Sequence, residues 1–472
     1  MSETTPERTQ RSRAMSPAAP SQSGKDEHPS EDPKTEASKP VMPVGFKAII
    51  PNMITAMVIM SGCALMVSLR PETTILGYKP WFGIVTVGGL PAFGLVIVFI
   101  GLLADIADGM VARCLKVGTK FGTYFDELSD LTAFGIAPAV YFMRYCMDGG
   151  GPHVLVFVSG FLYMLASVFR ISRELVVHRG KRPLFFVGVT TNMASFILAV
   201  FVFLFDRLGV TRWLPIVVVP LSIAMAVPKK LYKDPTGLFI SFSEQRRSIE
   251  EANRIEEQEF GREVSKPIMP IGFKAQIPNC ITGIVIWSGC ILMTMASLIG
   301  CKPEVGVAVV VVGLLADIAD GMTARALKVG TKFGSYFDEL ADLTAFGIGP
   351  AVYFMRHCID NGGSFIMACA AGYLYMLASV YRISRELVVH RGKRPLFFVG
   401  ITTNMASFIL VLVVLVFDAL GVSVYLPLAV LPLSVLMAIP RKFYKDPTGL
   451  FISFAEQKQS IEEADKEEKK QL

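Results

Sequence analysis

Aspartates recur at helical spacing in the segment 103–130, which reads LADIADGMVARCLKVGTKFGTYFDELSD. Asp105 and Asp108 are three residues apart and Asp126 and Asp130 are four apart, so each pair presents both carboxylates on one helix face. Apolar stretches flank these acids, and an ionised Asp inside a membrane costs about 2.5–3.5 kcal/mol on insertion scales. The group therefore needs a cation or a partner. Carboxylates clustered without His or Cys favour Mg²⁺ or Mn²⁺.

Small and basic residues accompany the acids. Gly109 and Gly122 would let a ligand approach the backbone closely, and Arg113 is placed to pair with a phosphate. The alternative is a solvated loop face whose acids pair with Arg113, Lys116 and Lys120. The flanking apolar stretches make that alternative the weaker one.

The chain is an internal duplication. VMPVGFKAIIPNMIT at 41–55 returns as IMPIGFKAQIPNCIT at 268–282, and Arg170–Gly188 is identical to Arg382–Gly400 over all 19 positions. The first copy carries an insertion near Gly77. The two copies predict two similar modules, each with its own carboxylate group.

The composition indicates a membrane protein. Of the 472 residues 52% are hydrophobic and only 18% are charged, against about 25% charged in a typical soluble chain. This composition excludes a disordered protein, a fibre and an ordinary soluble enzyme. The sequence has no cluster of basic residues interleaved with aromatic residues, so it gives no indication of nucleic-acid binding. The apolar stretches lie at 49–68, 82–104, 124–143, 154–171, 185–205 and 214–227, and at 277–299, 303–316, 336–355, 365–383, 397–417 and 424–439. We predict an all-α fold of about twelve spans in two parallel repeats of six.

Basic residues concentrate in the loops after the second, fourth and sixth stretches. The positive-inside rule then places both termini in the cytoplasm, in a bacterial cytoplasmic membrane or an endoplasmic reticulum. The expected organisation is a disordered tail, a first module, a charged linker, a second module and a charged tail, at 1–40, 41–235, 236–266, 267–447 and 448–472. The charged stretch SEQRRSIEEANRIEEQEF at 243–260 predicts a polar helix, and a matching stretch closes the chain.

The carboxylate segment resembles the signature of the CDP-alcohol phosphatidyltransferases, Asp-x2-Asp-Gly-x2-Ala-Arg-x8-Gly-x3-Asp-x3-Asp. The first copy matches it at Asp105, Asp108, Gly109, Ala112, Arg113, Gly122, Asp126 and Asp130. The second copy matches it at Asp317, Asp320, Gly321, Ala324, Arg325, Gly334, Asp338 and Asp342. Family members resemble the six-span module and commonly work as homodimers, which suggests that the two halves pair with each other as an intrachain pseudo-dimer.

The resemblance implies that an alcohol hydroxyl attacks the β-phosphoryl of a CDP-linked lipid and releases CMP. All eight aspartates would form the metal sites, with Mg²⁺ or Mn²⁺ on the pyrophosphate, and Asp130 and Asp342 would also act as general bases. The glycines, alanines and arginines of the signature would hold the CDP-lipid. Asn52, Thr55, Asn279 and Thr282 would hydrogen-bond the nucleotide, or else cap the first span of each module.

Further segments resemble the serine branch of the family. They are IPNMIT in the first span, ADLTAFGIGPAVYF after the last Asp, and FRISRE followed by FFVG. This implies CDP-diacylglycerol as donor and L-serine as acceptor. After FFVG the chain departs from many serine-type members with VTTNMAS and ITTNMAS. The same chemistry with inositol, glycerol phosphate or an inositol phosphate is therefore the alternative.

Basic residues at the end of the fourth span are candidates for gripping the lipid phosphate or an acceptor carboxylate. They are Arg170, Arg173, Lys181 and Arg182, with Arg382, Arg385, Lys393 and Arg394 in the second copy. Ordinary positive-inside topology is the competing explanation. A twelve-span secondary transporter has the same gross plan, but the acids here cluster at the predicted cytoplasmic ends of the spans rather than mid-membrane. Two intact acid sets also disfavour a non-catalytic lipid-binding protein.

Overall fold

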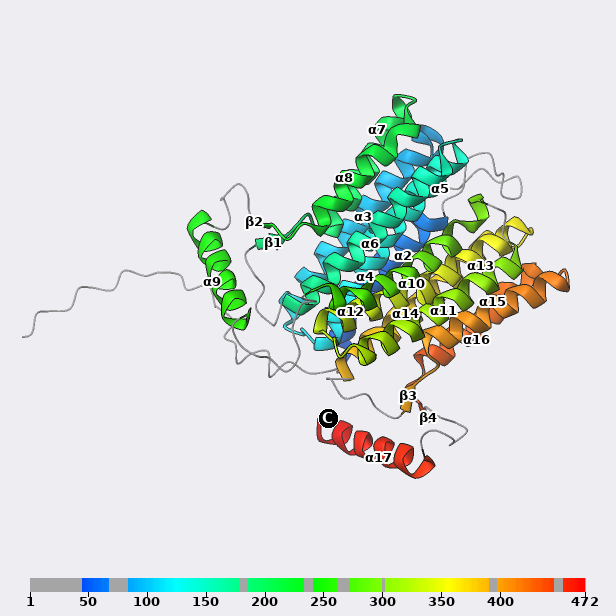
Figure 1. Cartoon of the computed structure of the whole chain (residues 1–472). Coiled ribbons are helices and arrows are strands. Elements are labelled where there is room, and N and C mark those ends of the chain that lie inside the picture. The colour runs from blue at the N-terminus through cyan, green and yellow to red at the C-terminus, as the bar shows by residue number, and fades with distance from the viewer. Residues whose placement is uncertain are drawn as a thin grey trace, which may run out of the picture. The chain divides into compact units, whose positions relative to one another are not determined.

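The computed structural model describes residues 45–67, 84–177, 185–232, 241–260, 272–298, 302–389, 397–444 and 453–471. The first module contains α2 (Phe46–Val67), α3 (Ile84–Leu115), α4 (Lys120–Asp130), η1 (Leu131–Ile136), α5 (Ala137–Asp148), α6 (His153–Val177), α7 (Thr191–Arg207), η2 (Thr211–Trp213) and α8 (Leu214–Ala226) (Figure 1). The second repeats it as α10 (Phe273–Leu298), α11 (Pro303–Ala326), α12 (Lys332–Asp342), η3 (Leu343–Ile348), α13 (Gly349–Asp360), α14 (Phe365–Val389), α15 (Thr403–Ala419), η4 (Ser423–Tyr425) and α16 (Leu426–Ala438).

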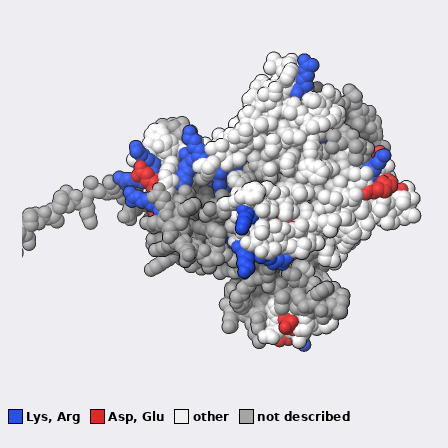
Figure 2. Space-filling model, in the orientation of Figure 1, with Lys and Arg blue, Asp and Glu red and all other residues white. Residues whose placement is uncertain are grey.

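Every predicted apolar stretch contains a helix, and the chain is a helical membrane protein. Six helices among the described residues are long and apolar enough to cross a bilayer: Phe46–Val67, Pro91–Leu115, His153–Val176, Phe273–Met295, Pro303–Ala326 and Phe365–Val388. Shorter apolar helices cover Thr211–Ala226, Thr403–Ala419 and Ser423–Ala438. The face of the helical body seen in Figure 2 is almost wholly uncharged, as lipid contact requires.

The third helical segment of each module is continuous through α4, η1 and α5, and η1 is a π-helical stretch. Pro138 lies near the start of α5 and has no N–H to donate to the carbonyl of Phe134, four residues earlier. The hydroxyl of Tyr163 on α6 donates to that carbonyl at 3.2 Å. The second module repeats this, because Tyr375 donates to Phe346 O at 3.2 Å. The helix therefore passes the proline without leaving a buried acceptor unpaired.

Each module also carries a two-stranded antiparallel pair that the all-α expectation missed. Strand β1 (Phe185–Val187) pairs with β2 (Lys230–Tyr232), and β3 (Phe397–Val399) pairs with β4 (Lys442–Tyr444). The predicted fifth apolar stretches, 185–205 and 397–417, were thus wrong at their starts. Gly188 and Gly400 follow the strands at φ +71°, a left-handed conformation that ends each strand. The helix begins only after this turn.

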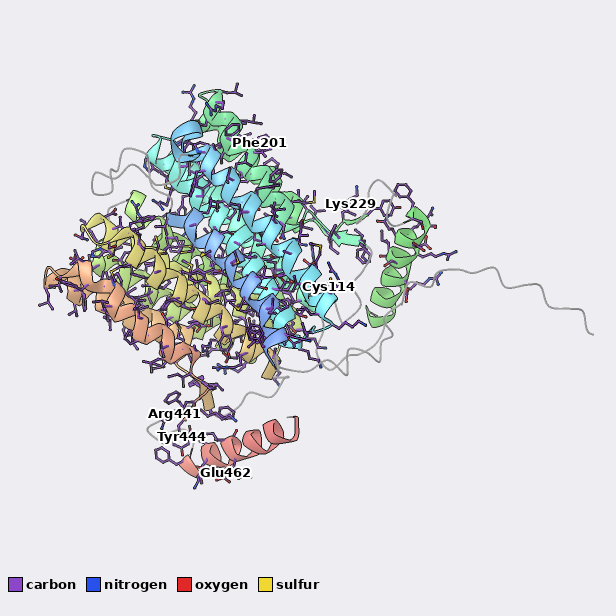
Figure 3. All side chains as sticks on the ribbon, turned by 180° about the vertical axis from the view of Figure 1, so that it is seen from behind. Cys114, Phe201, Lys229, Arg441, Tyr444 and Glu462 are labelled. Atoms are coloured by element: carbon purple, nitrogen blue, oxygen red, sulfur yellow. The ribbon has the colours of Figure 1, made fainter. Side chains whose placement is uncertain are left out.

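Two charged helices follow the strand pairs, as predicted. They are α9 (Phe242–Phe260) and α17 (Phe454–Gln471). Each packs an aromatic ring on the preceding strand: Tyr232 and Phe242 have ring centroids 5.8 Å apart, and so do Tyr444 and Phe454. Figure 3 shows Tyr444 at this junction, beside α17. The expected tail at 1–40 and the insertion near Gly77 lie outside the described residues.

Aromatic side chains join the helices of one module to those of the other. Phe121 of α4 packs on Tyr381 of α14 with centroids 5.3 Å apart, and Phe169 of α6 packs on Phe333 of α12 at 5.1 Å. The hydroxyls of Tyr124 and Tyr336 are 3.3 Å apart. These contacts hold α4 and α12, the helices that carry the second pair of aspartates in each module.

Candidate active site

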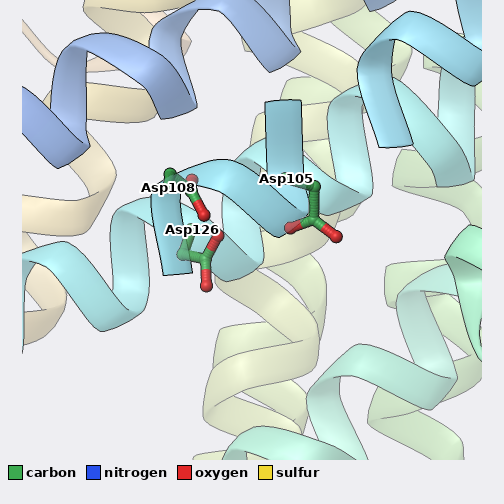
Figure 4. Close-up of side chains that lie close together, drawn as sticks. All are labelled: Asp105, Asp108 and Asp126. Atoms are coloured by element: carbon green, nitrogen blue, oxygen red, sulfur yellow. The ribbon is translucent and has the colours of Figure 1, made fainter. Parts of the chain in front are cut away.

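The structure brings together the carboxylates that the sequence spacing singled out. Asp105 and Asp108 lie on α3, and Asp126 comes from α4 (Figure 4). One carboxylate oxygen from each lies within 4.8 Å of the others, and Asp317, Asp320 and Asp338 repeat the arrangement. Helix α3 continues past the predicted apolar stretch to Leu115, so Asp105 and Asp108 occupy its last turns.

Asp130 completes the group one turn further along α4. Its carboxylate lies within hydrogen-bonding reach of Asp105. Its Oδ1 atom is buried and has no hydrogen-bond partner among the described residues, as is also true of Asp342 Oδ1. A buried carboxylate oxygen without a donor is costly unless a ligand satisfies it. That oxygen is therefore available to a substrate proton or an ion.

The turn between α3 and α4 sets the position of the second pair of acids. Lys116 adopts φ 52° after the last turn of α3, and Lys328 adopts φ 55° at the same place in the second module. Thr119 then caps α4 by accepting a hydrogen bond from Gly122 N at 2.9 Å. Thr331 caps α12 in the same way. These caps fix where α4 and α12 begin, and with that the direction of Asp126 and Asp338.

A threonine from the first helix orients one of the carboxylates. Thr55 is 3% exposed, and its hydroxyl donates to Asp108 Oδ2 at 2.5 Å. Thr282 donates to Asp320 Oδ2 at 2.6 Å. Thr55 was predicted either to bind the nucleotide or to cap the first span. In the structure it lies against an aspartate of the cluster, as a support for a metal-binding carboxylate would be placed.

The small and basic residues of the signature line the same end of α3 and α4. Arg113 is exposed and its guanidinium folds back toward Gly109, where an added Cβ would lie 3.7 Å from Nη1. At Gly122 an added Cβ would meet Asn52 Oδ1 at 3.4 Å. The missing side chain of Gly109 leaves the backbone of α3 open beside the carboxylates, whereas a Cβ at Gly122 would crowd the capping Thr119 Oγ1 at 3.1 Å. The matching positions Gly321, Arg325, Gly334 and Asn279 have the same arrangement, and Ala112 and Ala324 are half-buried on α3 and α11.

Sequence reasoning missed one residue of this site. Asn192, in the first turn of α7, donates from Nδ2 to Asp105 Oδ2 at 2.7 Å, and Asn404 donates to Asp317 Oδ2 at 2.8 Å. The Asn192 side chain also lies beside the Asp130 carboxylate. The only sequence signal was the departure VTTNMAS and ITTNMAS from the serine-type pattern, which contains both asparagines.

The predicted basic group divides in the structure. Arg170 is buried and pairs with Glu174 at 2.6 Å, and its Nε has no partner among the described residues. Arg173 uses its guanidinium on backbone carbonyls, with Nη1 on Ala226 O at 2.9 Å and Nη2 on Val187 O at 3.0 Å. It thus ties the end of α8 to β1. Arg382 and Arg385 repeat the two patterns, and Lys181, Arg182, Lys393 and Arg394 lie outside the described residues.

The donor set fits a divalent cation. Oxygens on opposite sides of one Mg²⁺ lie about 4 Å apart, so three carboxylate oxygens within 4.8 Å of one another need only small side-chain rotations to share an ion. The set contains oxygen donors and no thiolate or imidazole, which is the chemistry that Mg²⁺ and Mn²⁺ prefer.

Comparison with known families matches both modules. The model of the family described as CDP-alcohol phosphatidyltransferase matches residues 48–226 and 275–439. The chain belongs to the CDP-alcohol phosphatidyltransferase family. The two matched segments fit the tandem duplication, and each contains one complete carboxylate group.

The similar curated proteins act on serine by name. The CDP-diacylglycerol–serine O-phosphatidyltransferase of Helicobacter pylori (strain J99) is 32% identical over 147 residues, which are 31% of this chain and 60% of that protein. The protein of the same name from Methanocaldococcus jannaschii is 27% identical over 37% of this chain and 82% of that protein. The archaetidylserine synthase of Methanothermobacter thermautotrophicus is 33% identical over 21% of this chain and 42% of that protein.

The match thus spans 60% of the length of the Helicobacter relative. No solved structure matches the chain.

Proposed function

We propose that the protein transfers a phosphatidyl group from CDP-diacylglycerol to the hydroxyl of L-serine, giving phosphatidylserine and CMP in a metal-dependent reaction. The observation that carries the proposal is the carboxylate group at the ends of α3 and α4, present in both modules. Phosphoryl transfer depends on charge neutralisation and positioning, and four acids from two helices supply both. The serine-type names of the relatives support the acceptor.

The residues divide the work as follows. Asp105, Asp108 and Asp126 would hold the divalent ion on the pyrophosphate, where it neutralises the charge that develops on the phosphoryl oxygens and the leaving group. Asp130, whose Oδ1 receives no hydrogen bond from any described residue, takes the proton of the serine hydroxyl. The hydroxyl oxygen forms a new bond to the β-phosphorus while the bond to the CMP oxygen breaks, and CMP leaves.

The second module would carry out the same reaction with Asp317, Asp320, Asp338 and Asp342. Gly109, Ala112 and Arg113, with Gly321, Ala324 and Arg325, would hold the CDP portion of the lipid, because the open backbone beside each glycine leaves room for a nucleotide. Arg170 and Arg382 are the better candidates for an acceptor carboxylate. Arg173 and Arg385 already bind backbone carbonyls.

We propose that six helical segments of each module cross the membrane, giving twelve spans in two parallel repeats, with the modules at 41–235 and 267–447 and both termini cytoplasmic. The aromatic contacts between α4 and α14 and between α6 and α12 support an intrachain pseudo-dimer with two active sites. A covalent link between the modules raises the effective concentration of each for the other.

One observation favours an alternative acceptor alcohol. The departure from the serine-type pattern contains Asn192, a residue in contact with the carboxylate group. The same transfer to inositol, glycerol phosphate or an inositol phosphate is therefore the alternative function.

The test is CMP release by the purified protein from CDP-diacylglycerol with Mn²⁺ or Mg²⁺, with and without L-serine. Release that needs serine and disappears with EDTA is the expected result. Release with inositol or glycerol phosphate but not with serine would keep the chemistry and overturn the acceptor. No release with any acceptor would overturn the transferase itself.

A further inference from the structure

The amide of Asn192 connects two helices of the carboxylate group. Its Nδ2 donates to Asp105 Oδ2 at 2.7 Å, and the same side chain lies beside the Asp130 carboxylate. Asp105 belongs to α3 and Asp130 to α4, whereas Asn192 comes from α7. A single amide on a third helix thus contacts both a proposed metal-binding carboxylate and the proposed general base.

A hydrogen bond to the amide oxygen of Asn192 fixes the orientation of this amide. The hydroxyl of Thr191, which is 1% exposed, donates to Asn192 Oδ1 at 3.1 Å. An inverted amide would point Oδ1 at the Asp105 carboxylate, and two acceptors would then repel each other. The Thr191 contact and the Asp105 contact therefore demand the same orientation, with the amide N–H groups toward the acids.

Helix α7 begins where this contact is made. Thr190 caps its N-terminus by accepting from Met193 N at 3.2 Å. Strand β1 precedes the helix and ends at Val187, and the N–H of the next residue, Gly188, donates to Lys229 O at 2.9 Å. The strands missed by the sequence analysis thus set the point at which α7 starts, and with it the place of Asn192.

The second module repeats each of these contacts. Asn404 donates to Asp317 Oδ2 at 2.8 Å and lies beside the Asp342 carboxylate. Thr403 donates to Asn404 Oδ1 at 3.1 Å. Both copies of the site therefore keep the half-buried donor and its orienting hydroxyl in the same place relative to the carboxylates.

We propose that Asn192 and Asn404 are positioning residues that hold a metal-binding carboxylate and the general base of each site in one fixed arrangement. The inference rests on the metal-dependent transfer proposed above. Hydrogen bonds to metal-binding carboxylates orient them, and removing such a partner typically weakens metal affinity or activity about 10–100-fold. The amide also couples Asp130 to Asp105, so that the proton acceptor keeps its place relative to the bound pyrophosphate.

Binding of Mn²⁺ to the purified full-length protein, followed by electron paramagnetic resonance, tests the amide without any acceptor. Asn192→Leu with Asn404→Leu removes both donors and keeps a similar volume. We expect Mn²⁺ affinity to fall by about tenfold or more. We also expect kcat for CMP release to fall while the KM for CDP-diacylglycerol stays within about twofold, because the donor acts on the acids rather than on the lipid. Asn361→Leu, at the end of α13, is the matched control and should leave both values unchanged.

A second variant separates the donor from the shape of the side chain. Asn192→Asp with Asn404→Asp is isosteric but replaces a donor with an acceptor, so kcat should again fall by at least about tenfold. Native Mn²⁺ affinity in the leucine variant, or native kcat in the aspartate variant, would overturn the inference. If Asp105→Asn with Asp317→Asn left Mn²⁺ binding unchanged, the proposed metal site would fail instead, which is a different result.

Discussion

The two modules have the same hydrogen bonds at the end that holds the carboxylates, but different ones at the opposite end. At the carboxylate end the hydrogen bonds repeat within 0.1 Å: Thr55 to Asp108 at 2.5 Å against Thr282 to Asp320 at 2.6 Å, and Asn192 to Asp105 at 2.7 Å against its counterpart at 2.8 Å. At the far ends of α5 and α13 the partners have changed. Tyr145 donates to Asp206 in the first module.

In the second module a histidine replaces that tyrosine. His357 lies 3.0 Å from Asp418 and 3.3 Å from Ser423 Oγ. Both arrangements give a polar side chain, half-buried Tyr145 or buried His357, a partner on the neighbouring helices, but they do so with different chemistry. A structural requirement accepts any satisfied pair, whereas a fixed set of donors and acceptors is what a shared reaction demands. The comparison therefore supports the proposal that the carboxylate end carries the reaction and that the other end serves packing.

The largest effect is expected at the proposed general bases. Asp130→Asn together with Asp342→Asn removes the proton acceptor from both sites, and general-base catalysis contributes about 10²–10⁴-fold. CMP release should fall by about 10³-fold, with Mn²⁺ binding retained because Asp105, Asp108 and Asp126 remain. Each single variant should keep about half of the activity if the sites work independently. A single variant as inactive as the double would show that only one module is active.

A smaller effect is expected from the threonine that supports the cluster. Thr55→Val with Thr282→Val keeps the shape of the side chain and removes the hydroxyl that donates to Asp108 and Asp320. Metal affinity should fall by about tenfold, measured as the Mn²⁺ concentration that gives half-maximal CMP release. Ser159→Ala, a buried serine on α6 that donates only to its own helix, is the control. Unchanged Mn²⁺ dependence would mean that Asp108 is oriented without the hydroxyl.

How much of this could be predicted from the sequence depends on distance along the chain. Asp105 and Asp108 are one turn apart, so helical spacing alone puts them on one face. Asn192 is 87 residues from Asp105, and no periodicity indicates which helix end will meet α3. The strands were missed for a related reason. Phe185–Val187 is apolar and merges with the following apolar stretch, and only its pairing with Lys230–Tyr232, far along the chain, makes it a strand.

Arg173 shows a second limit of prediction from the sequence, because the residue was singled out but its role could not be decided. A basic residue at the end of an apolar span has a functional and a topological explanation, and its type and position cannot separate them. The structure adds the partner: the guanidinium binds the carbonyls of Ala226 and Val187. Those carbonyls belong to the end of α8 and to β1, which come together only in the folded chain.

The smallest effect on activity is expected at the far end, and it gives the comparison its strictest test. His357→Phe replaces a buried imidazole, which is 2% exposed, with a phenyl ring that cannot hydrogen-bond, and it leaves Asp418, which is 39% exposed, in contact with water. Losing hydrogen bonds of this kind costs about 1–3 kcal/mol, so the melting temperature in detergent should fall while CMP release per folded molecule stays within about twofold.

Tyr145→Phe is the matched variant in the first module and should behave in the same way, although its partner Asp206 belongs to a different pair. Because the two copies solve the same packing problem with different side chains, His357→Tyr should be tolerated better than His357→Phe: the phenol can donate to Asp418 as Tyr145 donates to Asp206. If any of these variants lowered kcat as strongly as the threonine substitutions, the ends of α5 and α13 would take part in the reaction. The reaction could then not be assigned to the carboxylate end alone.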